Sequence, residues 1–230
     1  MNNFTLIIPI YNEEKNIYTL YDEIINSEAK KYISKIIFVD DASEDKSLKV
    51  LNEISKNNQL VKIIKNEQNL GQSRSIYSAI LEANTKYVLT IDGDGQNDPK
   101  DISKLINCYL NNRSYNLIAG IRHNRKDNFI KKITSKIANL IRKFYLNDDC
   151  IDTGCALKLF ERNVIINFPF FNGIHRFLPA IYKGLNKNCC FINVNHRYRK
   201  FGKSKYGTVS RLVFGIRDMI KVKKLIKNNK

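Results

Sequence analysis

Residues 87–99 read YVLTIDGDGQNDP, an apolar run that ends in a crowd of polar side chains. The first half is rich in the β-branched and aromatic residues that favour strands. The second half places Asp92, Asp94 and Asp98 within a few positions of one another. Carboxylates this close repel one another unless a positive charge lies among them. The stretch therefore predicts a buried strand that opens into a cation-binding turn.

The same rhythm of apolar runs and helix-like segments fills the first half of the chain. Strands are expected at residues 4–10, 35–41, 61–66, 87–94 and 115–122. Helices are expected near residues 13–29, 44–57, 72–84 and 99–112. Continuous Ile/Val runs that alternate with helices are typical of a mainly parallel α/β sheet whose two faces are both covered. Ligands of such sheets bind beyond the carboxyl ends of the strands, where we expect Asp40–Asp41 and Asp92–Asp94 to be neighbours.

The second half of the chain has a different pattern. Helices are expected near residues 127–146, 175–184 and 209–227, with a strand near 189–198 and a basic, glycine-punctuated loop at 199–207. The first and last of these helices are amphipathic and lysine-rich, which is typical of helices that lie on an anionic membrane surface. The expected apolar face of the first includes Phe144 and is flanked by Arg142, and that of the last includes Ile220. Packing of the same apolar faces on the protein core is the alternative.

Charge is unevenly distributed over the 230 residues. Residues 1–115 carry 14 basic and 16 acidic side chains, whereas residues 116–230 carry 25 and 6. Such polarity indicates an anionic partner: nucleic acid, an anionic membrane surface or a phosphorylated substrate. No apolar run approaches the roughly 20 residues of a membrane span, and the start lacks the basic region of a signal peptide. The five cysteines form no CxxC motif, so we expect reduced thiols in the cytoplasm.

The acidic turn is a candidate metal site. Asp92 and Asp94 offer hard oxygen ligands, and Gln96 adds a carbonyl oxygen. Mg²⁺ and Mn²⁺ prefer such oxygens and commonly leave positions for substrate phosphates. A polar turn that merely caps helices is the alternative reading, with Asp98 before Pro99 as the capping residue. The second carboxylate pair, Asp40–Asp41, favours the metal-site interpretation over the helix-capping one.

Two further stretches suggest a nucleotide pocket. In IPIYNEE, Pro9 is expected to end the first strand early, and Tyr11 and Glu13 open the next helix at the same sheet edge as VDDASED. There they could shape a pocket for a base and ribose; a proline-terminated strand with an ordinary acidic helix start is the alternative. The chain has neither GxGxxG nor GxxxxGK[ST], so the fingerprints of dinucleotide and P-loop chemistry are missing.

An ordered set of motifs carries a family resemblance: IPIYNEE, VDDASED, NLGQSRSIYSAI, DGDGQNDP, DTGCALKLF and HRYRKFGKSKYG. In this order the chain resembles family-2 glycosyltransferases, and the polyprenyl-phosphate or dolichol-phosphate sugar synthases in particular, from Phe4 to about Gly215. The resemblance implies a GT-A fold, which is a Rossmann-like, mainly parallel sheet flanked by helices. It implies a catalytic domain over 1–208, with a nucleotide-sugar half (1–122) and an acceptor half (123–208). A basic amphipathic helix is expected to follow over 209–230.

The resemblance also implies roles for individual residues. Positions that hold the nucleoside are matched by Pro9, Tyr11, Glu13, Val39 and Asp41. Asp92, Asp94 and Gln96 match the metal site, and Asp92 and Gly93 also lie against the donor. Arg199 and Lys205, in the family's R-x-x-G-x-S-K loop, match groups that bind the donor's phosphates. Arg122 matches a basic position suited to a phosphate contact. Catalytic roles therefore fall to Asp94, Asp152, Arg199 and Lys205.

Asp152 decides between two acceptors. It lies where sugar-acceptor relatives place a catalytic base, although its surroundings fit the lipid-phosphate branch. Gly95 and Asn97 depart from that branch, which usually has an apolar residue and a His there. Many bacterial members also carry membrane helices after the catalytic domain, and none follows within these 230 residues. A membrane-anchor protein is therefore a candidate partner.

Together these observations predict an inverting, Mg²⁺- or Mn²⁺-dependent transfer of a hexose from a nucleotide sugar to a polyprenyl phosphate, at the cytoplasmic face of the membrane. Transfer to a carbohydrate acceptor of a surface polysaccharide is the alternative within the family. A nucleic-acid-binding protein is the alternative outside it, but the chain has no recognised nucleic-acid-binding motif, so nucleic acid is not expected as a partner. A binding subunit without turnover is a third possibility, which the complete set of Asp92, Asp94 and Gln96 disfavours.

Overall fold

A single seven-stranded sheet organises the chain. The computed structural model describes residues 4–56, 58–123, 142–201 and 208–229, with side chains of the last segment from residue 217 onward. The strands are β1 (Phe4–Ile10), β2 (Ile33–Asp40), β3 (Val61–Lys65), β4 (Tyr87–Thr90), β5 (Leu117–Arg122), β6 (Lys158–Glu161) and β7 (Cys189–Val194). Their order is β3-β2-β1-β4-β6-β5-β7, and only β6 runs antiparallel to its neighbours among these strands.

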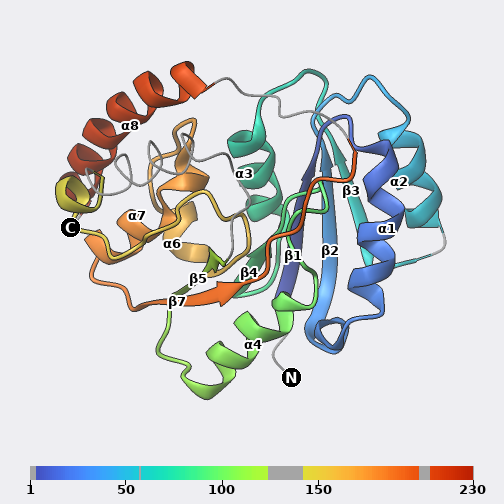
Figure 1. Ribbon diagram of the computed structural model, residues 1–230, viewed down its shortest axis with the longest axis horizontal. Coiled ribbons are helices and arrows are strands. Elements are labelled where there is room, and N and C mark those ends of the chain that lie inside the picture. Colours follow the sequence, from blue (N-terminus) through green and yellow to red (C-terminus); the bar gives the residue numbers. More distant parts are fainter. Residues whose placement is uncertain (1–3, 57, 124–141, 202–207, 230) are drawn as a thin grey trace.

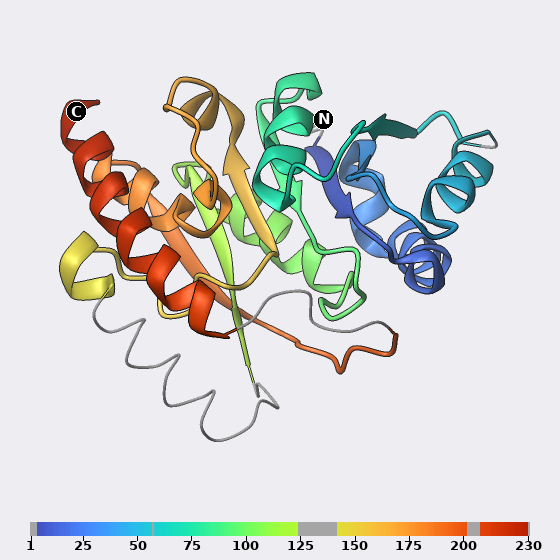
Figure 2. The same cartoon turned by 90° about the horizontal axis from the view of Figure 1, so that it is seen from above.

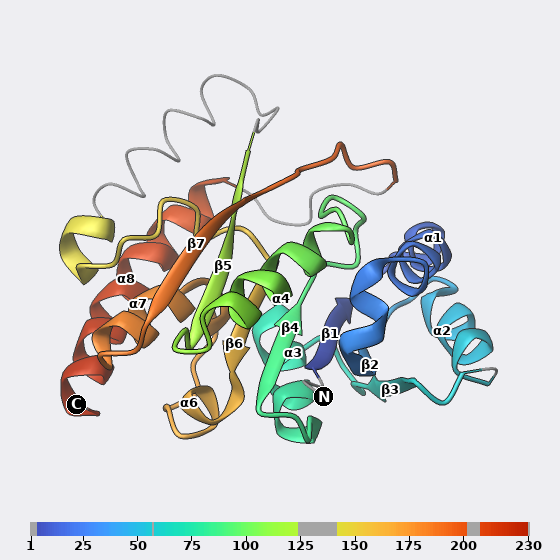
Figure 3. The ribbon, with the colours of Figure 1, turned by 90° about the horizontal axis from the view of Figure 1, so that it is seen from below.

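Helices cover both faces of the sheet (Figure 1). One face packs on α1 (Glu14–Ile25), α2 (Ser47–Lys56) and α4 (Asp101–Asn111), and the other on α3 (Gln72–Glu82), α6 (Arg162–Ile166), α7 (Leu178–Gly184) and α8 (Thr208–Asn228). Two short 3₁₀ turns, η1 (Glu28–Tyr32) and η2 (Ile174–Arg176), complete the described elements. Figure 2 shows α8 in front of the strands, and Figure 3, from the opposite side, shows α4 in front of them. Each face thus has its own apolar core, as the continuous Ile/Val strands require.

The chain reverses its direction of travel across the sheet between β1 and β4. From β1 it moves outward to β2 and β3, and then returns to place β4 on the other side of β1. Such a switch point leaves a crevice at the carboxyl ends of the strands, where open α/β sheets bind ligands. Tyr11, Asp41 and Asp92 follow the ends of β1, β2 and β4. The fold therefore brings the predicted motifs to one edge.

The predicted strands of the first half are confirmed, with two local corrections: the strand expected at 87–94 ends at Thr90, and the end of the first strand differs. Pro9 does not end the first strand: β1 continues to Ile10, and Pro9 pairs with Val39 of β2. The ladder between β1 and β4 ends at the pair Ile7–Thr90. Pro9 therefore lies past the end of that ladder, where its missing N–H is tolerated. Strand β6 was not predicted, because its four residues lack a distinct strand pattern.

The amphipathic helices of the second half differ in part from expectation. Most of residues 127–146 lies outside the described residues, but 142–146 are helical. There the expected faces are reversed: Phe144 is 92% exposed and Arg142 is buried. Arg142 is buried because its guanidinium pairs with Asp148 at 3.1 Å.

Helix α8 is anchored to the core in its described half. Val222 and Ile226 are buried against the cluster that contains α7, whereas Ile220, which was expected on the apolar stripe, is 56% exposed. In the described residues, no helix combines the length and the hydropathy of a membrane span.

Candidate active site

The acidic turn lies against the end of β1. The backbone N–H of Ile91 donates to the carbonyl of Ile7 at 3.2 Å, which carries the chain just beyond β4. A Cβ on Gly93 would lie 2.4 Å from Ile10 Cδ1 and 3.0 Å from the Pro9 carbonyl oxygen. Only glycine allows the backbone to approach this closely. Gly93 therefore fixes where the flanking carboxylates of Asp92 and Asp94 point.

Asp92 is a half-buried carboxylate beside the start of α3. Its Oδ1 accepts a hydrogen bond of 2.7 Å from Gln72 Nε2. Removal from water, and then the neighbouring Asp94 carboxylate, raise the pKa of Asp92 to about 7, although Lys158, Arg122 and Arg199 act in the opposite direction. Two desolvated carboxylates this close favour a bound cation.

Asp94 and Gln96 complete the predicted metal set. Asp94 is 8% exposed, and its Oδ1 accepts the backbone N–H of Gln96 at 3.0 Å. The Arg199 guanidinium donates to Asp94 Oδ2 and also lies 3.8 Å from Glu13 Oε1. Asp94 thus has both of its oxygens engaged, one by the turn and one by an arginine from a distant part of the chain.

These side chains fit a divalent cation that shares its coordination with a substrate. Among the described residues, no group of three or more His, Cys, Asp or Glu forms a self-sufficient metal cage. Mg²⁺ sites commonly use only one or two carboxylates and take their remaining oxygens from water and phosphates. Asp92, Asp94 and the Gln96 amide match that kind of site, and the raised pKa of Asp92 reflects a charge that lacks a sufficient counter-ion.

A segment after β7, residues 195–199, lies along the acidic turn; we refer to it as the strap. It runs from β7 across the sheet toward α1 (Figure 1). His196 forms a β-bridge with Asn97, and the backbone N–H of Arg197 donates to the Gln96 carbonyl at 2.8 Å. The Arg197 guanidinium then donates at 2.6 Å to Glu23 on α1 and at 2.6 Å to Asp98. The strap brings Arg199 to Asp94. Lys205 lies outside the described residues.

The predicted nucleoside-binding residues gather at the same edge. Pro9 and Val39 are paired neighbours on β1 and β2, and Tyr11 is half-buried after the end of β1. Glu13 is buried, with its Oε2 accepting Asn16 Nδ2 at 2.7 Å. Their roles toward a nucleoside remain predictions.

Asp41 forms hydrogen bonds with the loop between β3 and α3, a role that the sequence did not predict. Its Oδ1 accepts Asn66 Nδ2 at 2.7 Å and the Leu70 N–H at 2.9 Å, and its Oδ2 accepts the Gly71 N–H at 2.9 Å. These bonds hold the loop between β3 and α3. The pair Asp40–Asp41 was expected to support the metal site. Because Asp41 is used by this loop, the pair does not join Asp92 and Asp94 in one cluster. Asp40 is buried, and its Oδ1 has no hydrogen-bond partner.

Arg122 and Asp152 form a buried, two-pronged ion pair. Arg122 Nε and Nη2 each donate at 2.7 Å to a different oxygen of Asp152, and the Arg122 backbone N–H donates at 3.1 Å. Asp152 is 5% exposed. A Cβ on Gly154 would lie 2.7 Å from Arg122 Nη2. Asp152, the candidate base, and Arg122, the candidate phosphate contact, are thus ion-paired with each other.

The structure adds Lys158, which sequence reasoning missed, and gives a position to His175, which its place beside Arg176 had suggested for the acceptor site. Lys158 on β6 is 2% exposed, and burial lowers its pKa. His175 Nδ1 lies 2.7 Å from Ser73 Oγ at the start of α3, and burial, then Lys158 and Arg176, lower the pKa of His175 to about 3. Lys158 occurs in the motif DTGCALKLF, but only the antiparallel path of β6, which pairs Lys158 with Thr90, brings it toward Asp92.

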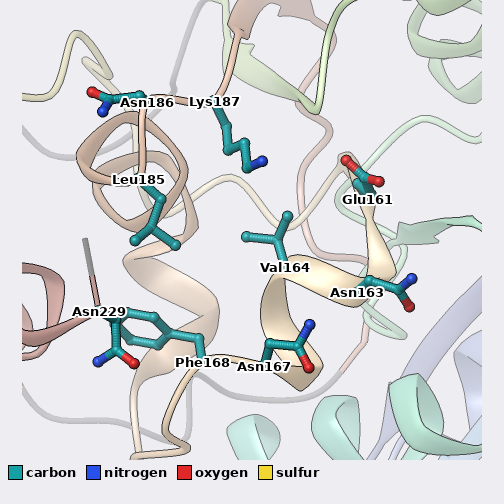
Figure 4. A pocket seen from close by; sticks show the side chains of 9 residues that line it. All are labelled: Glu161, Asn163, Val164, Asn167, Phe168, Leu185, Asn186, Lys187 and Asn229. Carbon is teal, nitrogen blue, oxygen red and sulfur yellow. The ribbon is translucent and has the colours of Figure 1, made fainter.

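A separate hollow of about 390 Å³ lies elsewhere on the molecule (Figure 4). Its lining includes Glu161 at the end of β6, Val164 and Asn167 on α6, and Lys187 before β7. Because β6 runs antiparallel, its end lies at the opposite edge of the sheet from the acidic turn. The hollow is therefore not part of the candidate active site.

Comparison with known proteins places this geometry in context. Residues 5–168 match the family described as Glycosyl transferase family 2. The chain is 32% identical over 223 residues to the dodecaprenyl-phosphate galacturonate synthase of Rhizobium johnstonii, covering 95% of the chain and 65% of the relative. It is 30% identical over 209 residues to the undecaprenyl-phosphate 4-deoxy-4-formamido-L-arabinose transferase of Proteus mirabilis, covering 90% and 63%. The chain thus spans slightly less than two thirds of the length of these curated relatives.

Solved structures share the fold. The glucosyl-3-phosphoglycerate synthase of Mycobacterium tuberculosis, in complex with Mn²⁺, uridine diphosphate and phosphoglyceric acid, superposes with a TM-score of 0.70 at 15% identity, covering 96% of this chain and 77% of that one. The same enzyme with phosphoglyceric acid alone gives 0.71 at 14% identity, covering 96% and 79%. The likeness confirms the predicted sheet flanked by helices.

Proposed function

The chain belongs to glycosyl transferase family 2, and from this premise we propose that it transfers a sugar, expected to be a hexose, from a nucleoside diphosphate to a polyprenyl phosphate. The relatives named as polyprenyl-phosphate sugar transferases support the lipid acceptor. The observation that carries the proposal is the acidic turn at the switch point of the sheet, with Arg199 held over it by the strap.

The donor half of the reaction follows from this arrangement. Asp92, Asp94 and Gln96 would hold a Mg²⁺ or Mn²⁺, which supplies positive charge to the diphosphate as the sugar departs. Arg199 and, by its motif, Lys205 would neutralise the rest of that developing charge from above. Gly93 keeps the turn close to β1, so the donor's diphosphate would lie between the turn and the strap. The nucleoside would then extend toward Tyr11 and Asp41.

The acceptor half rests on the Arg122–Asp152 pair. A general base needs a free carboxylate oxygen aimed at the proton it removes. Both oxygens of Asp152 instead accept from Arg122, so Asp152 is better placed to orient that guanidinium than to act as a base. A phosphate acceptor is already largely ionised near neutral pH, its second pKa being about 6, and requires no strong base. Attack from the face opposite the diphosphate would invert the anomeric carbon.

A carbohydrate acceptor remains the second candidate, since Asp152 is buried at the acceptor side of the sheet and its sequence position matches that of a base. Asp152→Asn separates the two. For a phosphate acceptor, we expect the KM for the acceptor to rise roughly tenfold, through disturbed Arg122, while kcat falls by much less than the roughly 10²–10⁴-fold typical of losing a general base. Loss of kcat on that larger scale, with donor affinity retained, would favour the carbohydrate acceptor.

We further propose peripheral association with the cytoplasmic membrane face, where polyprenyl phosphates present their head groups. Arg217, Lys221 and Lys224 are exposed on α8 around the exposed Ile220, which suits an anionic lipid surface. A membrane-anchor protein is a further proposed partner.

The direct test is a transfer assay. Purified protein is incubated with Mg²⁺ or Mn²⁺, a panel of nucleotide sugars and a short-chain polyprenyl phosphate, and products are identified by mass spectrometry. We expect a polyprenyl-phosphate sugar from at least one donor, and none after chelation. Formation of an oligosaccharide instead, or product formation at full rate in the presence of a chelator, would contradict the proposal.

A further inference from the structure

Arg199 occupies a carboxylate oxygen of Asp94 that a divalent cation would use as a ligand. Its guanidinium donates to Asp94 Oδ2, and the other oxygen of Asp94 accepts the Gln96 backbone N–H. Turning Asp94 to offer a different oxygen would break that turn-forming bond. A cation that binds Asp94 would therefore lie directly beside the guanidinium, and like charges a few ångströms apart repel.

The strap keeps Arg199 at this position. Arg197, two residues earlier, is tied to Glu23 and Asp98 at 2.6 Å each, and its backbone N–H bonds to Gln96. The anchor limits how far Arg199 can move, so its local concentration at Asp94 is high. A contact that is only half-buried and individually weak is in this way made persistent.

The Arg199–Asp94 contact also offsets negative charge in the turn when no ligand is bound. Asp92 and Asp94 are two crowded carboxylates, and Arg199 is among the groups that lower the pKa of Asp92. One guanidinium supplies a single positive charge there. A divalent ion supplies two, so replacing Arg199 would improve the balance of charge in the turn.

We propose that Arg199 is a substitute cation for Asp94 in the donor-free protein and leaves Asp94 when a divalent ion binds. This inference rests on the metal site of the proposed function. On leaving, Arg199 stays tethered by the strap above the turn, where the diphosphate of the donor is expected. Cation and donor then bind cooperatively, because the cation releases the side chain that the donor uses, and the coupling is reciprocal.

Removing the guanidinium tests the exchange through cation affinity rather than turnover. Mn²⁺ is titrated calorimetrically, without nucleotide, into wild type, Arg199→Gln, Arg199→Lys and Lys200→Gln. Lys200 is the exposed neighbour, so its variant loses the same charge without losing a contact to Asp94. We expect Arg199→Gln to bind Mn²⁺ at least about threefold more tightly than wild type, the size of one lost half-buried ion pair. Arg199→Lys and Lys200→Gln should stay near wild type.

The outcomes separate this inference from the proposed function. Equal or weaker Mn²⁺ binding by Arg199→Gln, with normal binding by wild type, overturns the exchange and leaves the metal site intact. Equal tightening in Lys200→Gln also overturns it, because the effect would then be one of net charge. Failure of every variant to bind millimolar Mn²⁺ overturns both the exchange and the proposed function.

A second measurement uses the unaltered chain and is independent of how the variants fold. If Mn²⁺ displaces Arg199, amide hydrogen exchange rises at Tyr198 and Arg199, which follow the Arg197 anchor, and stays unchanged at residues 195–197. Unchanged or slower exchange at Tyr198 and Arg199, under conditions where calorimetry detects Mn²⁺ binding, contradicts the proposal.

Discussion

At the scale of the residue, the site depends on a few charges held in unfavourable surroundings. Asp92 has its pKa raised to about 7 by removal from water and by Asp94. Gly93, between them, allows the turn to lie against the end of β1, because any side chain there would collide with Ile10. Asp94 is neutralised by Arg199. The turn thus crowds negative charge, and we expect a bound cation to relieve the cost of that crowding.

Substitution of Asp92 by Asn should reveal this cost as a function of pH. The pKa of Asp92 in the folded protein, about 7, lies above its ordinary value of 3.8, so the folded state holds this proton more tightly. The stability it contributes is complete at low pH and is lost as the pH rises toward and through 7. Without divalent ions, we expect Asp92→Asn to melt at least about 2 °C higher than wild type above pH 7, which corresponds to roughly 1 kcal/mol.

The comparison is made by differential scanning calorimetry in chelator, near pH 5 and near pH 8. The advantage of Asp92→Asn should shrink at the lower pH, and added Mn²⁺ should raise the melting temperature of wild type alone. A difference that does not vary with pH would mean that Asp92 is not under this strain.

At the scale of the element, the strap connects two parts of the chain that are distant in sequence. Residues 195–199 leave β7 in the predicted acceptor half, and His196 bridges to Asn97 in the predicted nucleotide-sugar half. Arg197 contributes most to this connection, because its guanidinium joins α1 and the acidic turn through Glu23 and Asp98. Burial acts to lower the pKa of Arg197, but the hydrogen bonds and charges of Glu23 and Asp98 together raise it, so Arg197 stays charged. The position of Arg199 follows from this anchor.

Arg197→Gln should therefore loosen the strap without removing any residue of the metal site. We expect amide exchange in residues 195–199 to rise roughly tenfold, as for the loss of about 1.4 kcal/mol of local stability, and donor affinity to fall. Overall melting should change little, because the pair is half-exposed. Hydrogen exchange measured by mass spectrometry tests this, with Arg176→Gln as the control, since Arg176 pairs with Asp218 on α8 instead. Equal protection of the strap in Arg197→Gln and wild type would assign its position to other contacts.

At the scale of the whole molecule, one sheet carries the residues proposed for both halves of the reaction. The donor motifs meet at the switch point between β1 and β4, and the Arg122–Asp152 pair lies at the end of β5, beyond the antiparallel β6. Helix α8 closes the back of this second half through Val222 and Ile226. The exposed lysines of α8 are therefore carried by a helix that is packed on the core, and we propose that this surface faces the membrane.

The sequence predicted the elements that depend on local residue patterns and missed the contacts between distant segments. The five strands of the first half, the helices between them and the shared edge of their motifs follow from apolar runs and from the rule for parallel sheets. Strand β6 and the pairing of Arg122 with Asp152 depend on contacts between distant segments, which a single sequence does not encode visibly. The exposed Phe144 and the buried Arg142 reverse a periodicity argument for the same reason: the partner of Arg142, Asp148, lies beyond the helix.

The central claim is that the acidic turn and the strap together hold a cation and a diphosphate. Isothermal titration of uridine diphosphate and other nucleoside diphosphates measures it most directly, with Mn²⁺ or with chelator, on wild type, Asp94→Asn and the control Asp149→Asn, an exposed acid elsewhere on the surface. We predict that at least one nucleotide binds wild type and Asp149→Asn only when Mn²⁺ is present, and that Asp94→Asn loses this binding. Equal affinity in chelator, or undiminished Mn²⁺-dependent binding by Asp94→Asn, would contradict the account.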